Sequence, residues 1–172
     1  GDFAKAEEIL RVKLGNKANK AAARVAAEGI VGVYVSDDRK LGALFEVNSE
    51  TDFVAKNETF TSFVEAVNAA ALASDLQGGK DGEDIEALLA VPFEGATVKD
   101  ALVEKTATIG EKLSIRRFEK VAGDVAVSYI HGGGRIGVLV EADTAVVNDA
   151  VKEALKNVAM QVAALNAKYV SQ

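Results

Sequence analysis

The sequence contains no cysteine, one histidine and one proline among its 172 residues. Without cysteine the chain has neither a disulfide framework nor a thiolate metal site, and a single histidine excludes a metal site built from several imidazoles. A histidine-based nucleophilic triad would have to use His131, and no Gly-x-Ser-x-Gly turn accompanies that residue. We therefore expect no metal site, no bound cofactor and no histidine-based nucleophilic catalysis.

Long apolar runs and a surplus of positive charge are also missing. No signal-peptide pattern and no apolar stretch of about 18 residues is present, so we expect a cytoplasmic protein without a membrane span. The net charge of −6 at pH 7 disfavours direct nucleic-acid binding, which needs lysine and arginine to displace phosphate counterions. A protein partner fits this charge better, and a homo-oligomer stays open.

The first part of the chain shows helical periodicity followed by a hairpin pattern. Apolar spacing predicts two short helices over 3–14 and 17–28, separated by a glycine-asparagine stop. β-Branched and aromatic residues over 30–35 and 41–47, on either side of a polar turn, indicate an antiparallel hairpin. Phenylalanines and valines at helical spacing then predict a helix over 58–73 that covers this hairpin.

An acidic stretch follows, with eight acids against two lysines between residues 75 and 104. We interpret it as a linker that contains a short helix near residues 85–89 and a longer helix that begins at Val98 and ends near Gly110. No D-x-D-x-D-G loop with its closing glutamate is present, which favours a solvated acidic face over a calcium site.

The last third repeats the hairpin-plus-helix pattern. Strands are predicted over 113–121, 125–130 and 136–141, and apolar steps of three and four from Val147 to Leu165 predict a helix. A basic residue opens both the strand at Lys40 and the strand at Arg135, with glycine at the third place and glutamate at the seventh. The offset of 95 residues suits a duplicated subdomain.

These elements predict an α+β fold of two related subdomains, in which helices cover antiparallel hairpins or sheets after a short N-terminal helical segment. The expected organisation is a helical lead-in over 1–29, a first β-β-α subdomain over 30–74, an acidic helical linker over 75–112, and a second, incomplete β-β-β-α subdomain over 113–172.

A polar corner with a phenylalanine in it follows the first hairpin. Phe45 to Asn57 reads FEVNSETDFVAKN, so a carboxylate and an aromatic ring leave the backbone side by side at Asp52 and Phe53. A phenylalanine directly after a strand is most often a core residue. The alternative is an exposed ring that inserts into a partner, and the residues by themselves leave both interpretations open.

Three stretches together resemble a known family. The run at 46–57, the SIRRF run at 114–118 and the SYIHGGGRIGVLV run at 128–140 are similar, in this order, to the elongation factor Ts family. Its members promote nucleotide exchange on the GTPase elongation factor Tu. Against the family pattern a small N-terminal helical domain is almost wholly absent, and more sequence is expected after Leu165. We therefore expect a family member truncated at both ends.

The resemblance implies a mechanism and a set of contact residues. In the family, a Thr-Asp-Phe-Val corner inserts between two helices of the GTPase and disturbs the magnesium that holds the nucleotide. Here this partner-binding role falls on Thr51, Asp52, Phe53 and Val54. A secondary partner contact is implied for His131, Gly132 and, more loosely, Arg135.

Other functions remain as alternatives. The chain could be a binding or scaffold module that associates with elongation factor Tu, or with itself, without catalysing exchange. Gly132, Gly134 and Gly137 satisfy the G-x-G-x-x-G pattern of dinucleotide sites, but the run opens a predicted strand where that fingerprint needs a helix. A small enzyme that acts on phosphates through this glycine run is the least favoured interpretation.

Overall fold

The computed structural model describes residues 2–169. Its elements in chain order are α1 (Phe3–Ala22), β1 (Glu28–Val35), β2 (Leu41–Ser49), α2 (Asp52–Ala55), α3 (Glu58–Ala73), α4 (Ile85–Leu89), β3 (Pro92–Phe93), β4 (Ala96–Thr97), α5 (Val98–Ile109), β5 (Ser114–Ala122), β6 (Val125–His131), β7 (Ile136–Ala142) and α6 (Asp149–Leu165). All strand pairs are antiparallel and helices cover them, which confirms the expected α+β class.

A three-stranded sheet in the order β1-β2-β5 forms the centre of the molecule. Its central strand pairs Phe45 with Phe118 on β5, and the two rings stack with centroids 5.5 Å apart. Helix α3 packs its apolar stripe against the sheet, as the phenylalanine spacing predicted. The buried residues of this core are Phe45, Val47, Phe60, Phe63, Val64, Val67, Ala71, Leu88, Val98, Leu113, Ile115 and Phe118.

The strand at Ser114–Ala122 corrects the predicted grouping of the elements. We expected it to belong to the second subdomain, but it pairs with β2 and completes the first sheet. The second sheet therefore contains two strands, β6 and β7. Local periodicity identifies a strand without identifying its neighbour, and here the neighbour is chosen by long-range packing of apolar side chains. The subdomain boundaries themselves stay a prediction.

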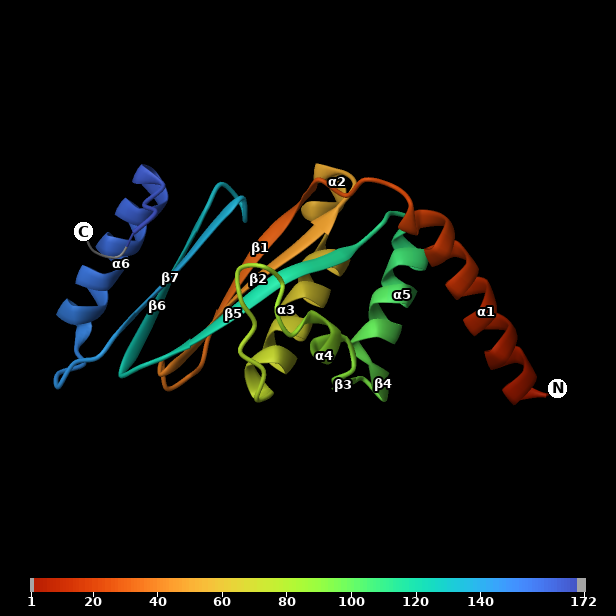
Figure 1. Cartoon of the computed structure of the whole chain (residues 1–172), viewed down its shortest axis with the longest axis horizontal. Helices are drawn as coiled ribbons and strands as arrows, with labels where there is room; N and C mark the ends of the chain where they lie inside the picture. The colour runs from red at the N-terminus through yellow and green to blue at the C-terminus, as the bar shows by residue number, and fades with distance from the viewer. Residues whose placement is uncertain (1, 170–172) are drawn as a thin grey trace.

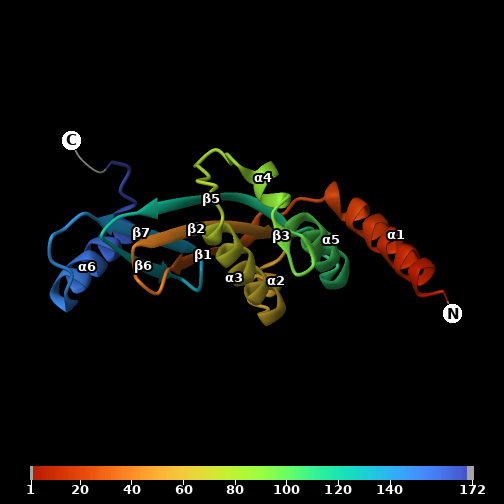
Figure 2. The same cartoon turned by 90° about the horizontal axis from the view of Figure 1, so that it is seen from below.

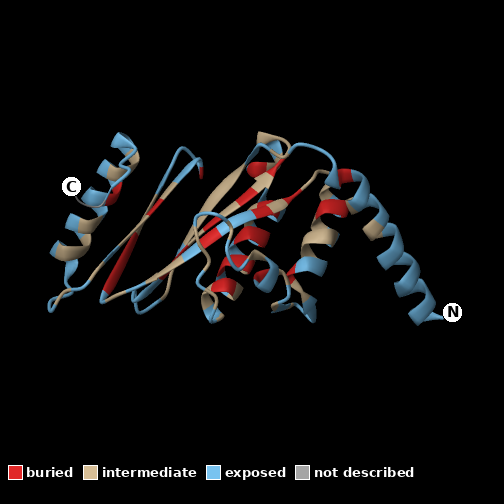
Figure 3. Ribbon diagram, viewed as in Figure 1, coloured by how far each residue is buried: buried red, intermediate tan, exposed pale blue. Residues whose placement is uncertain are grey.

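Helix α1 replaces the two predicted helices and ends at Ala22, before the predicted end at residue 28. The structure shows one helix where we expected two, and it passes through Gly15 without interruption. Glycine costs only about 1 kcal/mol in a helix interior relative to alanine, and good helix formers on both sides outweigh that cost. Asp2 caps the beginning of the helix by accepting a hydrogen bond from the Lys5 N–H at 3.2 Å. The outer part of α1 is exposed (Figure 3).

The β6–β7 hairpin lies between the three-stranded sheet and α6 (Figure 1). Two glycines make this close approach sterically feasible, because a Cβ on Gly42 would lie 2.7 Å from Leu139 and a Cβ on Gly137 would lie 2.6 Å from Val31. Gly42 and Gly137 are the glycines at the third place of the two similar strands. The sequence similarity thus coincides with the surface on which the two hairpins pack.

The two ends of the described chain lie far apart. Helix α1 is at one end of the molecule and α6 at the other, with the sheets between them (Figure 2).

Helix α5 carries a capping box in which Thr97 and Asp100 satisfy each other's backbone N–H groups, and Gly110 ends it in the left-handed conformation. Within residues 2–169, no helix combines the length and the apolar character that crossing a bilayer requires.

Candidate functional site

The polar corner begins where β2 ends. Ser49 is the last strand residue, and Thr51 caps the four-residue helix α2 by accepting a hydrogen bond from the Val54 N–H at 3.4 Å. Ala55 is buried and Val54 packs against the core, so one side of this short helix is anchored. The corner residues Thr51, Asp52, Phe53 and Val54 are called the wedge below.

Phe53 points away from the core of its own molecule. Its side chain is 81% exposed, whereas Phe45 and Phe60, the phenylalanines on either side in the sequence, are fully buried. The exposed position excludes the core role for Phe53 that the sequence had left open. A large apolar ring held in water at the end of an anchored turn is a candidate contact for a partner.

Asp52 forms an ion pair with Lys56 one turn later, with 2.8 Å between Lys56 Nζ and Asp52 Oδ2. The hydrogen bond from Lys56 is the main reason that the pKa of Asp52 lies below its ordinary value, and the charge of Arg135 lowers this pKa further. Asp52 is therefore a carboxylate at neutral pH. Arg135 lines one pocket together with Gly29 and Asn48, and Asn48 lies near the end of β2, where the polar corner begins.

The β6–β7 turn contains the second set of predicted contact residues. His131 is exposed, and its Nδ1 lies 3.0 Å from the Tyr129 hydroxyl. Gly132 and Gly134 adopt positive φ angles of 62° and 97°, which glycine reaches without steric cost. The Gly134 carbonyl accepts a hydrogen bond from the Val31 N–H at 2.7 Å, which docks the turn on the edge of β1.

The structure brings only part of the predicted set together. Arg135 shares a pocket lining with Asn48 near the wedge, but no hydrogen bond among residues 2–169 joins His131 or Gly132 to the wedge. The glycine run leads into β7 and not into a helix, so the phosphate-binding context of a dinucleotide fingerprint is missing here. In the described part of the chain, no group of three or more potential metal ligands is found.

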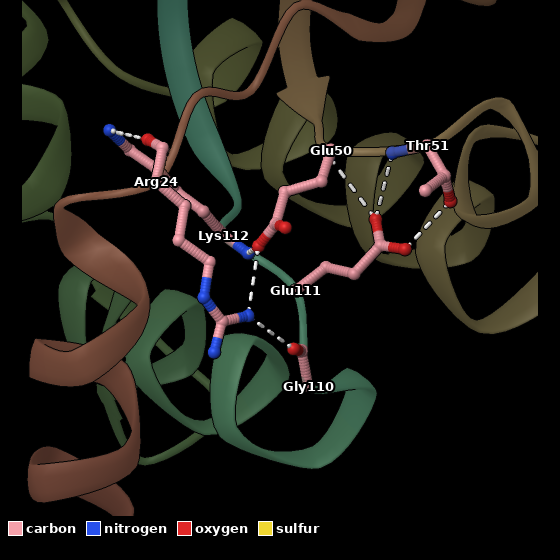
Figure 4. Close-up of polar contacts among 6 residues, drawn as sticks. All are labelled: Arg24, Glu50, Thr51, Gly110, Glu111 and Lys112. Atoms are coloured by element: carbon pink, nitrogen blue, oxygen red, sulfur yellow. Dashed lines mark hydrogen bonds and ion pairs between the residues drawn. The ribbon is translucent and has the colours of Figure 1, made fainter.

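A carboxylate that the sequence reasoning did not identify holds the wedge in place (Figure 4). Glu111, in the loop after α5, accepts hydrogen bonds from the Glu50 N–H at 3.1 Å and from the Thr51 N–H at 3.0 Å. Its other oxygen accepts a hydrogen bond from the Thr51 hydroxyl at 2.6 Å. One side chain thus binds three donors at the beginning of α2.

The bonding between the two loops is reciprocal. The Glu50 carboxylate accepts the Lys112 N–H at 2.6 Å and the Arg24 guanidinium at 3.1 Å, and the Lys112 bond is the main reason that the pKa of Glu50 is lowered. The same Arg24 nitrogen donates to the Gly110 carbonyl at 3.0 Å (Figure 4). The interaction of residues 50–51 with residues 110–112 is called the clasp below.

Sequence patterns contain no direct signal for the clasp. Glu111 is one acidic residue among many, and about 60 positions separate it from Thr51. The available hint is the glycine stop at Gly110, which frees the next residues from the helix. Only the pairing of β5 with β2 places this loop beside the wedge.

Comparison with known proteins identifies the family. Residues 50–172 match the family model described as Elongation factor TS. The chain belongs to the elongation factor Ts family. The matched segment includes both the wedge and the β6–β7 turn, whereas α1 and β1 precede it.

Individual relatives agree with this assignment. An elongation factor Ts of Clostridioides difficile is 51% identical over 175 aligned residues, which cover 100% of this chain and 55% of the relative. One from Bordetella petrii is 48% identical over 165 residues, covering 95% of this chain and 52% of the relative. One from Azoarcus sp. is 51% identical over 143 residues, covering 82% and 46%. The chain thus spans about half the length of these curated relatives.

Proposed function

We propose that this chain is a translation elongation factor that acts in the cytoplasm, binds elongation factor Tu and promotes the release of its GDP. Family membership supports the class of function. The single structural observation that carries the proposal is the exposure of Phe53, 81% of whose side chain is open to a partner. No bond is made or broken in this reaction, so the chain is not an enzyme in the chemical sense.

The physical basis of the exchange is differential affinity. A factor that binds the nucleotide-free GTPase more tightly than the nucleotide-bound form weakens nucleotide binding by the same factor, because the two equilibria are linked. In our proposal Phe53 inserts between helices of the GTPase and disturbs the magnesium site of that partner. Burying a phenylalanine ring contributes about 1.5–3 kcal/mol, which is the size of a typical allosteric coupling.

The other wedge residues hold the ring in position. Thr51 caps α2, Asp52 pairs with Lys56, and Val54 packs against the core. A corner that is ordered before binding loses less conformational entropy when it meets the partner. The chain therefore presents Phe53 from a capped turn whose neighbouring residues are packed against the core.

We assign the secondary partner contact to the β6–β7 turn. His131, Gly132 and Arg135 are exposed there, and Gly132 has no side chain to keep a partner backbone away. Arg135 and Asn48 line the same pocket, and Asn48 lies near the end of β2, just before the wedge. One partner surface can therefore approach the wedge and this turn from the same side.

The test is the release of fluorescent GDP from elongation factor Tu, with and without this chain. We expect acceleration by the wild-type chain and a loss of about 10- to 150-fold for Phe53→Ala, which corresponds to the burial energy of the ring. Phe3→Ala is the matched control, because Phe3 is 89% exposed at the outer end of α1. Equal acceleration by the wild-type chain and Phe53→Ala would remove the wedge from the mechanism.

A second candidate function is a binding or scaffold module that associates with elongation factor Tu without catalysing exchange. It is supported by the β6–β7 turn, where His131, Gly132 and Arg135 are exposed and offer a contact that does not depend on Phe53. A stable complex in analytical ultracentrifugation, combined with an unchanged rate of GDP release, would favour this module over the exchange factor.

A further inference from the structure

We propose that Glu111 is a positioning residue for the wedge: its carboxylate orients α2 and thereby sets the direction in which Phe53 leaves the molecule. The inference rests on the proposed exchange function. It adds a residue outside the wedge, in a different loop, that acts on the partner only through Phe53.

The geometry of the clasp concentrates three donors on one carboxylate. The N–H groups of Glu50 and Thr51 both donate to Glu111 Oε2, and the Thr51 hydroxyl donates to Oε1 at 2.6 Å. Hydrogen bonds to an ionised carboxylate are shorter and stronger than bonds between neutral groups. Glu111 therefore fixes two consecutive backbone groups and one side-chain rotamer directly before α2.

Helix α2 depends on such outside support because it is short. Four residues cannot offset the entropy cost of nucleating a helical turn by their own hydrogen bonds. The Thr51 cap on the Val54 N–H is long, at 3.4 Å. Since Glu111 Oε1 accepts the hydroxyl hydrogen, a lone pair of Thr51 Oγ1 stays directed at Val54. Removing the Glu111 carboxylate lets the hydroxyl rotate away.

The residues directly before and after Glu111 are both hydrogen-bonded to other parts of the chain. The Gly110 carbonyl accepts a hydrogen bond from Arg24, and the Lys112 N–H donates to the Glu50 carboxylate. Lys112 Nζ also donates to the Arg24 carbonyl at 3.0 Å. The loop after α5 is thus fixed at the positions before and after Glu111, and the carboxylate has a defined location from which to orient the wedge.

The chemistry of the contact predicts an order among substitutions. Glutamine keeps one oxygen for the two backbone N–H groups, but its NH₂ group then faces the Thr51 hydroxyl, which must turn its hydrogen elsewhere. Alanine removes all three acceptor contacts. We therefore expect Glu111→Gln to weaken the function partly and Glu111→Ala to weaken it more.

The experiment is a double-mutant cycle on GDP release from elongation factor Tu. We expect Glu111→Ala to reduce the acceleration by about tenfold or more, since small displacements of a positioned group cost factors of this order. In the Phe53→Ala background the same change should have an effect below about twofold, because Glu111 acts through the ring. Glu104→Ala, which removes an exposed acid on α5, is the control and should leave the rate unchanged.

A second measurement reads the position of the ring directly in the free chain. With 4-fluorophenylalanine at position 53, we expect Glu111→Ala and Glu111→Gln to change the ¹⁹F resonance. Amide exchange of Thr51 and Val54 should become faster, while amides of α3 keep their protection. If Glu111→Ala does not fold and Glu111→Gln does, GDP release and the NMR spectra are both measured on Glu111→Gln.

The outcomes separate this inference from the exchange function. An equal loss on Glu111 substitution with and without Phe53, or an unchanged ¹⁹F resonance with unchanged amide exchange, would overturn the role of Glu111. If the wild-type chain does not accelerate GDP release, the proposed exchange function is wrong. The ¹⁹F resonance and the amide exchange then still show whether Glu111 orients the wedge.

Discussion

Gly137 lies against Leu44, and a Cβ on this glycine would lie 3.3 Å from the leucine side chain. The mirror contact exists on the other hairpin, where Gly42 lies against Leu139. In the two similar strands these residues occupy equivalent places, third and fifth. The two hairpins therefore pack on each other through the same pair of positions, and this packing places the β6–β7 turn beside β1.

We predict that Gly137→Ala destabilises the protein by about 1–3 kcal/mol, because the added methyl group overpacks the contact with Val31, 2.6 Å away. Urea unfolding followed by circular dichroism measures the change. Gly15→Ala is the control, because it adds the same methyl group where no atom lies within 4 Å and the φ angle is not positive. A Gly137→Ala variant no less stable than Gly15→Ala would argue against close packing of the hairpins.

We predict that Phe118→Ala destabilises the protein by about 3–5 kcal/mol, since it leaves a cavity beneath the stacked ring of Phe45. Phe53→Ala should change the unfolding free energy by less than about 0.5 kcal/mol, because it removes an exposed side chain. The pair is compared by denaturant titration at one pH. Similar losses for both variants would contradict the assignment of Phe118 to the core and Phe53 to the surface.

We predict that stability falls in acid partly through Glu50. Its pKa is lowered in the folded chain, first by the Lys112 N–H, so its ionised form stabilises the fold above the unfolded-state pKa of about 4.3. This contribution is lost as the pH falls through the lower, folded-state pKa. Glu50→Gln should therefore reduce the difference between the urea midpoints at pH 7 and pH 3, whereas Glu104→Gln should preserve it.

We predict that Gly15→Ala stabilises α1 locally by about 1 kcal/mol, because Gly15 lies inside a continuous helix and has open space around its Cα. Slower amide exchange of the residues on either side, measured by NMR, checks this. If α1 were two helices separated at Gly15, the alanine would bring no increase in protection.

Much of the fold follows from the order of the residues alone. The first hairpin and the helix after it follow from alternation and from the spacing of Phe60, Phe63 and Val67, which are local patterns. The longer helix of the acidic segment ends at Ile109, directly before the glycine near which its end was predicted. The family resemblance carried by residues 46–57 was likewise legible in the sequence and is confirmed by the comparisons.

Other features were decided only by the tertiary structure, because they depend on contacts between distant segments. Periodicity could not assign β5 to β2, nor could it place Phe53 outside the core while Phe45 and Phe60 are inside. The clasp between Glu111 and Thr51 arises from that same strand pairing. Sequence by itself determined where the longer strands and most of the longer helices form, since those preferences are local. The pairing of the strands and the contacts between distant side chains were determined only by the tertiary structure, because both depend on burial and on long-range hydrogen bonds.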